Sequence, residues 1–145
     1  MEETQEPSNV STIEYITMAT LGNSADFGDL SNDPRNQNNG GISSNSIRGI
    51  IMGGSNGSSV TDHIEYITIA TLSDSTDFGN LSGTSSNGAN ASSPTRAVRM
   101  GTASPAYTNT IEYVQIMTTG DAIDFGDLNT KQAYQAACSN GHGGL

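Results

Sequence analysis

The pattern of hydrophobic and polar positions along this chain repeats three times. The stretch IEYITMATLGNSADFGDLS begins at Ile13, and close copies begin at Ile64 and Ile111, so the periods are 51 and 47 residues. In every copy the first isoleucine and the phenylalanine of a D-F-G tripeptide stand 14 residues apart. The changes in length therefore lie in the connector after D-F-G-x-L, as is typical of surface loops.

Each copy of this stretch predicts two strands. In I-E-Y-I-T-x-A-T both faces of a strand would carry apolar or β-branched side chains, so we expect this strand to be covered on both sides. A turn signal at Gly22-Asn23 follows, and a second, short strand is expected around Phe27.

A second element follows each copy: SNSIRGIIMGG from Ser44, SSPTRAVRMGTA from Ser92 and CSNGHGGL from Cys138, with Arg48, Arg96 and His142 at equivalent places. The apolar run predicts a strand that is stopped by Gly53-Gly54, and a short Ser-rich strand before it gives about four strands per repeat, as in a β-propeller blade. We expect one repeat domain over residues 1–145, with repeats at approximately 10–59, 60–108 and 109–145.

The order of these elements resembles a Kelch blade. An apolar run ending in Gly-Gly (GIIMGG, 49–54) is followed by Tyr66 in the next strand and by the aromatic Phe78, where Kelch repeats usually have Trp. The second junction departs from this pattern, because AVRMGT has Thr102 in place of the second glycine, and the first copy has no preceding Gly-Gly.

The amino-acid sequence of the repeat resembles even more closely the Kelch-like repeats of phage and aquatic environmental sequences, in which units similar to NTIEYITIATTGNATDFGDL and CSSSTRGVFGGG recur in tandem. The resemblance extends from about Val10 to Leu145. It implies an all-β fold of Kelch-like β-propeller blades, about three four-stranded repeats, in a structural protein of a virion or extracellular surface, such as part of a tail fibre or an adhesin.

Three blades are too few to close a propeller, which has about four to eight. Either copies associate, for example two copies that make six blades, or the chain is a piece of a larger propeller. An open arc would expose sheet edges and apolar blade faces. We therefore expect the partners to be a second copy, in a homo-oligomer, or other virion proteins.

Composition narrows the partners further. The formal net charge is −10, which repels nucleic acid and anionic lipid, so neither is an expected partner. No apolar run approaches the ~20 residues that cross a bilayer, so no membrane insertion is expected. The N-terminal MEETQEPSN has no apolar core of a secretory signal, and the single cysteine allows no internal disulfide.

The D-F-G tripeptide invites comparison with kinases, but the Gly-rich loop, strand lysine and H-R-D loop that a kinase needs are missing from the sequence. We expect structural roles for it: phenylalanines that pack between blades, glycines that permit a turn or a close backbone approach, and aspartates that accept backbone hydrogen bonds. The recurring arginines are expected to pair with a D-F-G aspartate of a neighbouring blade. The structural residues so assigned are Tyr15, Tyr66, Tyr113, Asp26, Asp77, Asp124, Phe27, Phe78, Phe125, Gly28, Gly79, Gly126, Arg48 and Arg96.

No catalytic, metal or cofactor site is expected. Asp26, Asp29 and Asp33 are spaced unlike an EF-hand loop, and turns that need capping explain them as well. His63 is expected in a loop, and Cys138 at a small blade position. The chain is therefore predicted not to be an enzyme.

The polar segments 31–41 and 82–94 are the better candidates for binding, although they suit solvated connectors equally well. Their candidate binding residues are Asn36, Gln37, Asn38, Asn87 and Asn90. The predicted function is that of a non-enzymatic structural or host-attachment component of a phage virion or extracellular assembly. The alternative is a lectin-like, carbohydrate-binding β-propeller that recognises cell-surface glycan through these loops.

Overall fold

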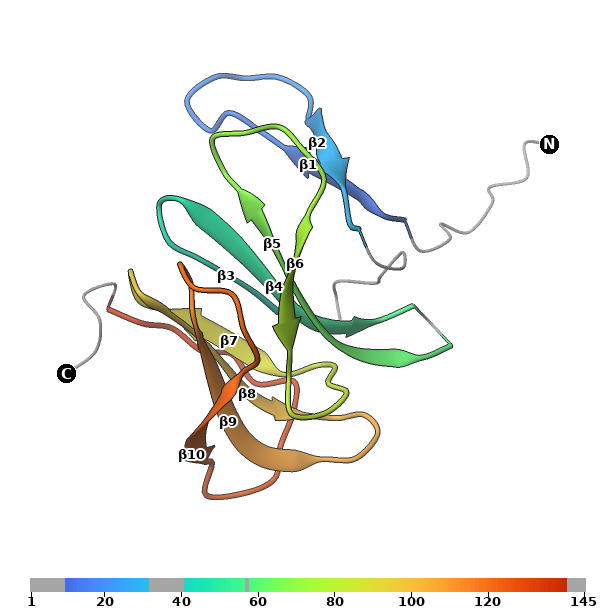
Figure 1. Cartoon of the computed structure of the whole chain (residues 1–145), viewed down its shortest axis with the longest axis vertical. Coiled ribbons are helices and arrows are strands. Elements are labelled where there is room, and N and C mark those ends of the chain that lie inside the picture. Colours follow the sequence, from blue (N-terminus) through green and yellow to red (C-terminus); the bar gives the residue numbers. More distant parts are fainter. Residues whose placement is uncertain (1–9, 32–40, 57, 141–145) are drawn as a thin grey trace.

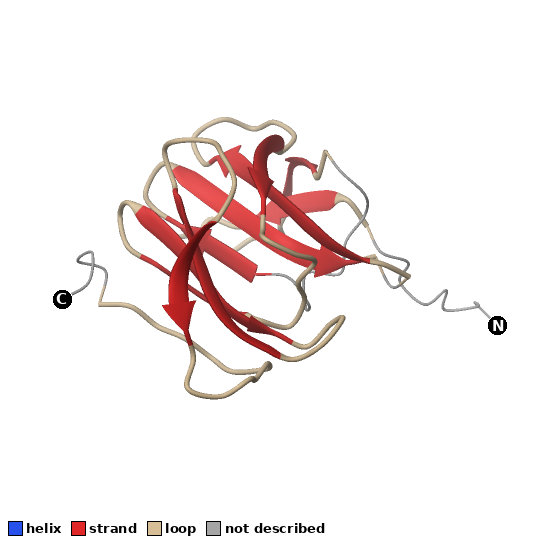
Figure 2. Ribbon diagram, turned by 60° about the horizontal axis from the view of Figure 1, so that its bottom comes forward, coloured by secondary structure: helices blue, strands red, loops and turns tan. Residues whose placement is uncertain are grey.

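The computed structural model describes residues 10–31, 41–56 and 58–140. In these ranges the chain forms strands and no helix (Figure 2), which confirms the predicted all-β class. The strands are β1 (Thr12–Tyr15), β2 (Ala25–Asp29), β3 (Gly41–Ser44), β4 (Arg48–Ser55), β5 (Val60–Thr68), β6 (Thr76–Asn80), β7 (Ala89–Ser92), β8 (Arg96–Thr102), β9 (Thr108–Gln115) and β10 (Ile123–Asp127).

The strands form three antiparallel sheets that follow one another along the chain and in space (Figure 1). The first contains β1 and β2, the second β3 to β6, and the third β7 to β10, and in both larger sheets the spatial order equals the sequence order. Each four-stranded sheet thus joins the arginine-bearing strand pair of one sequence repeat to the I-E-Y and D-F-G strands of the next. No sheet in the described ranges closes on itself.

The I-E-Y strand is covered on both faces only in the second sheet, which lies between the other two (Figure 1). There the neighbouring residues Ile64 and Glu65, which point to opposite faces, are both fully buried. The strand is shorter than predicted at its end. Residues after Thr68 turn instead, with the Thr71 N–H donating to the Thr68 carbonyl (2.9 Å).

The D-F-G tripeptide lies in the short strand expected there and forms a β-bulge. Of the two roles expected for its glycine, a turn or a close backbone approach, the turn is wrong. In the second sheet Ile64 pairs with Gly79 and Glu65 with Asp77, so Phe78 is the extra, unpaired residue. The same shift occurs in the other two sheets. Because a bulge bends its strand and re-aims a side chain, this repeated irregularity gives each phenylalanine the same direction.

The pair Gly53-Gly54 does not stop its strand as predicted. β4 continues to Ser55 through a register shift between Met52 and Gly54. Gly53 has a φ of 66°, and a Cβ atom there would lie 2.4 Å from the Ser85 carbonyl oxygen. The glycine is therefore needed for a bulge that lies against the segment between β6 and β7, and not to end the strand.

The hydrophobic core lies between the two four-stranded sheets. The second sheet contributes Ile50, Met52, Ile64 and Phe78, and Leu81 directly after β6 joins them. The third sheet contributes Ala97 and Val114, together with Ile116 directly after β9.

Candidate functional site

The sheets are joined by the same contacts at both junctions, and we call each set of contacts a seam. A seam joins the D-F-G strand of one sheet to the turn that precedes the D-F-G strand of the next. In the second seam the Asn80 N–H donates to Asp121 Oδ1 (3.0 Å), and in the first seam the Asp29 N–H donates to Asp74 Oδ1 (2.9 Å). The aspartates that cap backbone at the seams are therefore not the D-F-G aspartates.

The glutamate of I-E-Y is a second part of each seam. Glu65, which is fully buried, accepts hydrogen bonds from the hydroxyls of Ser31 (2.5 Å) and Ser75 (3.0 Å). Glu112 accepts bonds from the Ser82 N–H (3.1 Å) and the Ser82 hydroxyl. The sequence interpretation missed this role, although the signal was present: every copy has this glutamate, and Ser or Asn follows every D-F-G-x-L.

Two of the three D-F-G glycines lie directly against the backbone of the turn in the next sheet. A Cβ atom on Gly28 would stand 2.5 Å from the Ser73 carbonyl oxygen, and one on Gly79 would stand 2.4 Å from the Gly120 carbonyl oxygen. A Cβ atom on Gly126 would meet nothing within 4 Å. Gly126 therefore has nearly the same φ as Gly28 and Gly79, but no backbone of another sheet lies against it in the described residues.

The aromatic residues show the same asymmetry. Each D-F-G phenylalanine packs edge-on against the tyrosine of its own sheet, with ring centroids 6.2 Å apart for Tyr15–Phe27, 6.0 Å for Tyr66–Phe78 and 5.9 Å for Tyr113–Phe125. Phe27 and Phe78 are 7% and 3% exposed, whereas Phe125 is 55% exposed. A following sheet covers the first two, and no following sheet lies within the described residues to cover Phe125.

The recurring arginines have different partners from those expected. Arg48 lies over the Tyr66 ring (4.2 Å to the centroid) and donates to the Ile116 carbonyl (3.1 Å), and Arg96 lies over the Tyr113 ring (4.6 Å). Within the described ranges neither arginine pairs with a D-F-G aspartate. Stacking on a tyrosine serves the guanidinium because the ring face is electron-rich.

The remaining polar candidates are dispersed. Asp26, Asp77 and Asp124 are exposed, and Asp124 accepts a bond from the Gly126 N–H (3.2 Å). His63 lies on β5, not in a loop, with Nδ1 3.1 Å from Asn80 Oδ1. Among the described residues no three His, Cys, Asp or Glu side chains gather as metal ligands, and Asp33 and His142 lie outside those residues.

Segment 82–94 is only partly a loop, because it contains β7 and a bridge between Ser86 and Ser104. Asn87 and Asn90 are half-buried and donate to Ser86 Oγ (3.2 Å) and to the Gly88 carbonyl (3.3 Å). The other candidate binding residues, Asn36, Gln37 and Asn38, lie outside the described residues.

The first strands of the two larger sheets lie side by side. The Ser92 hydroxyl donates to the Ser44 carbonyl (2.9 Å), and the Ser139 hydroxyl donates in the same way to the Ser92 carbonyl. Ser139, and not the exposed free thiol Cys138, therefore continues this series. A shallow hollow of about 550 Å³ lies along these residues.

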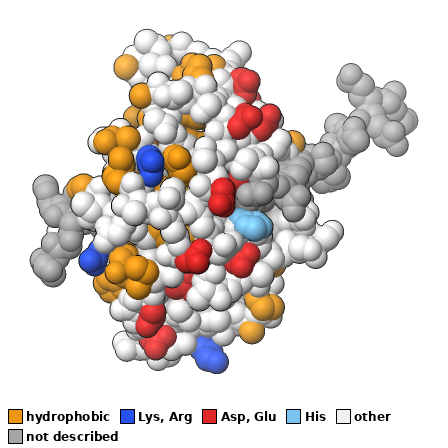
Figure 3. Space-filling view, in the orientation of Figure 1, with side chains coloured by type: hydrophobic (Ala, Val, Ile, Leu, Met, Phe, Trp, Pro, Cys, Tyr) orange, Lys and Arg blue, Asp and Glu red, His pale blue; other side chains and the backbone are white. Residues whose placement is uncertain are grey.

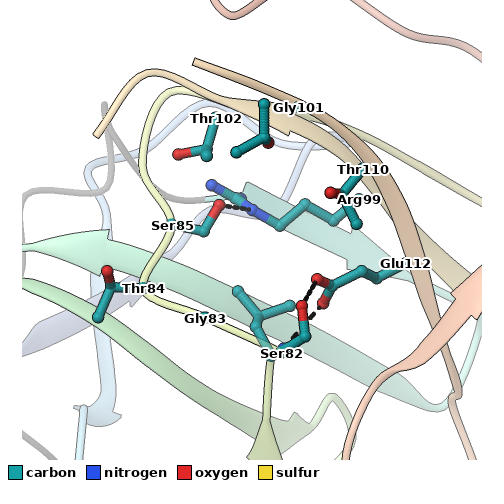
Figure 4. Close-up of a pocket in the computed structure, with 11 residues that line it drawn as sticks. Ser82, Gly83, Thr84, Ser85, Arg99, Gly101, Thr102, Thr110 and Glu112 are labelled. Carbon is teal, nitrogen blue, oxygen red and sulfur yellow. Dashed lines mark hydrogen bonds between the residues drawn. The ribbon is translucent and has the colours of Figure 1, made fainter. Parts of the chain in front are cut away.

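A smaller cavity of about 80 Å³ lies between the second and third sheets, under the start of segment 82–94 (Figure 4). Arg99 of β8 and Glu112 of β9 are paired across the two strands and both line it. The Arg99 Nε donates to Ser85 Oγ (2.7 Å) and its Nη1 to the Met52 carbonyl (3.0 Å). Ser82 donates hydrogen bonds to the Glu112 carboxylate through its N–H and its hydroxyl (Figure 4).

Arg99 is a buried charge that the sequence interpretation missed. Its side chain is 3% exposed, and burial lowers the pKa of the guanidinium to about 10, against an opposing contribution from the Glu112 charge. Arg99 remains protonated at neutral pH. The signal was an arginine in AVRM where the first repeat has isoleucine in GIIM.

The surface is mostly neutral and polar on the face in Figure 3, with scattered acidic groups and apolar side chains gathered mainly along its left side. No helix in the described part of the chain could span a membrane. None of the known protein families matches this chain, and none of the curated proteins does either.

Proposed function

We propose that this chain is a non-enzymatic structural module made of Kelch-like propeller blades, which associates end to end with further copies in a virion or other extracellular assembly and there serves attachment to a host. The observation that carries the proposal is the exposure of Phe125, a residue whose two counterparts are buried by the next sheet. Burying such a side chain stabilises an interface by about 1.5–3 kcal/mol.

The two ends of the described chain carry complementary halves of a seam. At one end Phe125, Gly126 and Asp127 repeat the residues that face the next sheet. At the other end Gly22 and Asn23 precede β2, at the positions that Gly120 and Asp121 hold in the second seam. The Asn23 amide oxygen can accept a backbone hydrogen bond as Asp121 does. One copy can therefore add to another by a third seam.

The placement of the first strands supports blades arranged about a common axis. β3 and β7 are joined through Ser44 and Ser92, while the D-F-G strands at the other side of the sheets are joined through the seams. Sheets that meet in this way along a chain form the arc from which a propeller is built. A second copy, or another virion protein with the same repeat, would extend this arc.

Light scattering of the purified chain tests this proposal. We expect a dimer or larger species, and we expect Phe125→Asp to shift it to a monomer with an unchanged far-UV circular dichroism spectrum. Tyr107→Asp is the matched control, because Tyr107 is 54% exposed but lies outside both seams. A wild-type monomer at the highest soluble concentration would refute end-to-end association, and turnover of polysaccharides by the purified protein would refute the non-enzymatic role.

A further inference from the structure

The first I-E-Y strand has an open edge. Within the described ranges β1 pairs with β2 alone, whereas the equivalent strands β5 and β9 each pair with a D-F-G strand on one side and with an arginine-bearing strand, β4 or β8, on the other. β1 ends at Tyr15, and the equivalent strands continue for two further residues, to Thr68 and Gln115. An edge strand presents unpaired N–H and C=O groups, so β1 can pair with another strand.

The side chains along this edge are exposed where their counterparts are covered. Ile16 is 65% exposed, whereas its counterpart Val114, which faces Ala97 of β8, is 2% exposed. Tyr15 is 40% exposed, and no arginine lies over its ring in the described ranges, although β4 and β8 each place one over the equivalent ring. A strand of the same kind beside β1 would contact both side chains.

The charges at this edge favour β8 over β4 as the template for the missing strand. Arg99 of β8 faces Glu112, whereas β4 has isoleucine opposite Glu65. Glu65 is fully buried and accepts hydrogen bonds from two serines, so it does not need a cation. Glu14 is exposed and accepts one hydrogen bond in the described structure, from Ser24 (3.1 Å).

Glu14 also stands beside a second negative charge. It pairs across the strands with Asp26 of β2. Glu112 pairs in the same way with Asp124 and has Arg99 on its other side. Because like charges directly opposite each other destabilise strand pairing and opposite charges stabilise it, a cation on the open side of Glu14 would be favourable.

We propose that the open edge of β1 binds an extended basic segment of a partner chain, of the R-x-x-R-M kind found in β8, by antiparallel strand pairing. In the register of β8 with β9, the second arginine stands opposite Glu14 and the first lies over Tyr15. The added strand extends β1 to Thr17 and covers Ile16. This inference goes beyond the association through Phe125 and does not depend on it, because it uses the edge of β1.

The test is titration of the ¹⁵N-labelled chain with a synthetic peptide of residues 93–102, SPTRAVRMGT, followed by nuclear magnetic resonance. The Phe125→Asp variant is the receptor, so that association between copies does not compete. We expect saturable shifts of the amide signals of residues 12–17, with slower hydrogen exchange at Ile16 and Thr17. The absence of any saturable shift, or saturable shifts confined to the other edge strands, would overturn the proposal.

A charge exchange tests the register. In an Arg99→Glu version of the peptide a glutamate stands opposite Glu14, so we expect this peptide to bind the receptor at least about threefold more weakly. Glu14→Arg in the receptor should reverse the order of the two peptides. Asp77→Arg is the matched control, because it changes the net charge equally at an exposed position of β6 and should keep the original order.

Equal affinities of the two peptides for the receptor that keeps Glu14 would contradict the assigned register. So would a reversal of their order by Asp77→Arg. The result is separate from that for end-to-end association: the wild-type chain, at a concentration where it is monomeric, should bind the peptide as tightly as the Phe125→Asp variant does.

Discussion

At the scale of single residues, the same residue type at equivalent positions of the repeat has different structural roles, because the neighbouring residues differ. Gly79 and Gly126 have φ values of 149° and 141°, so both hold a backbone that side chains rarely adopt. Only Gly79 lies against another backbone. Conformation explains why each repeat has a glycine here, and packing explains why losing one of them should matter more.

Alanine at these two glycines should therefore have unequal effects. The strain from φ is common to both, while Gly79→Ala also forces a Cβ atom onto the Gly120 carbonyl, which should add about 1–3 kcal/mol of destabilisation. Urea denaturation at low protein concentration measures the difference. Equal midpoints for Gly79→Ala and Gly126→Ala would show that the sheets do not approach each other as described.

At the scale of elements, the seam depends on a glutamate that lies in the middle of a strand. Glu65 is fully buried and joins the first sheet, through Ser31, to the second. Its counterpart Glu14 is exposed and accepts only from Ser24 of its own sheet in the described structure (3.1 Å). The same residue type is thus a junction in one repeat and a surface group in another.

Replacing these glutamates by glutamine should reveal this difference. Glu65→Gln removes a charged acceptor of two hydroxyl hydrogen bonds and should lower the free energy of unfolding by about 1–3 kcal/mol. Glu14→Gln should change it by less than about 0.5 kcal/mol, as surface substitutions do. Thermal unfolding of the two variants, at a protein concentration where the chain is monomeric, is the measurement, and a larger loss for Glu14→Gln would contradict the assigned seam.

The sequence predicted the elements better than their junctions. The β class, the short strand at Phe27 and the four-stranded unit followed from period, β-branched residues and spacing. The bulge at Phe78 could not be read in this way, because a bulge depends on register with a partner strand. The role of Glu65 was hidden for a related reason: its partner Ser31 belongs to another repeat, and only the packed sheets bring the two together.

The candidate site was predicted less well. The sequence placed the candidate binding residues in the variable polar segments 31–41 and 82–94, whereas the cavity is also lined by Arg99, a residue of β8 that departs from the repeat. Of the polar segment 82–94, only its beginning lines the cavity, and Asn87 and Asn90 are engaged in local hydrogen bonds. The departure of Arg99 from isoleucine is visible in the sequence, but its burial is a tertiary property.

At the scale of the whole molecule, charge opposes association. Each copy has a formal net charge of −10, so two copies repel one another, while the proposed third seam is built from an aromatic ring and hydrogen bonds and contains no ion pair. Salt screens the repulsion, since the Debye length falls from about 10 Å at 0.1 M to about 3 Å at 1 M. The apolar contact itself is not weakened by this screening.

Association should therefore tighten as ionic strength rises. We expect the dissociation constant, measured by sedimentation equilibrium, to fall several-fold between low and high sodium chloride. The Phe125→Asp variant should remain monomeric throughout the series. Tighter association at low salt would mean that ion pairs hold the copies together, which the proposed seam does not contain.

The repetition of the seam also determines how such a chain can change in length during evolution. In-frame loss or duplication of one period brings a D-F-G strand against the turn of a different copy, and the donors and acceptors at that new junction match those of the old one. Recombination between the similar coding segments can therefore lengthen or shorten the protein without inventing a new interface. Selection then needs to act only on the residues that break the pattern.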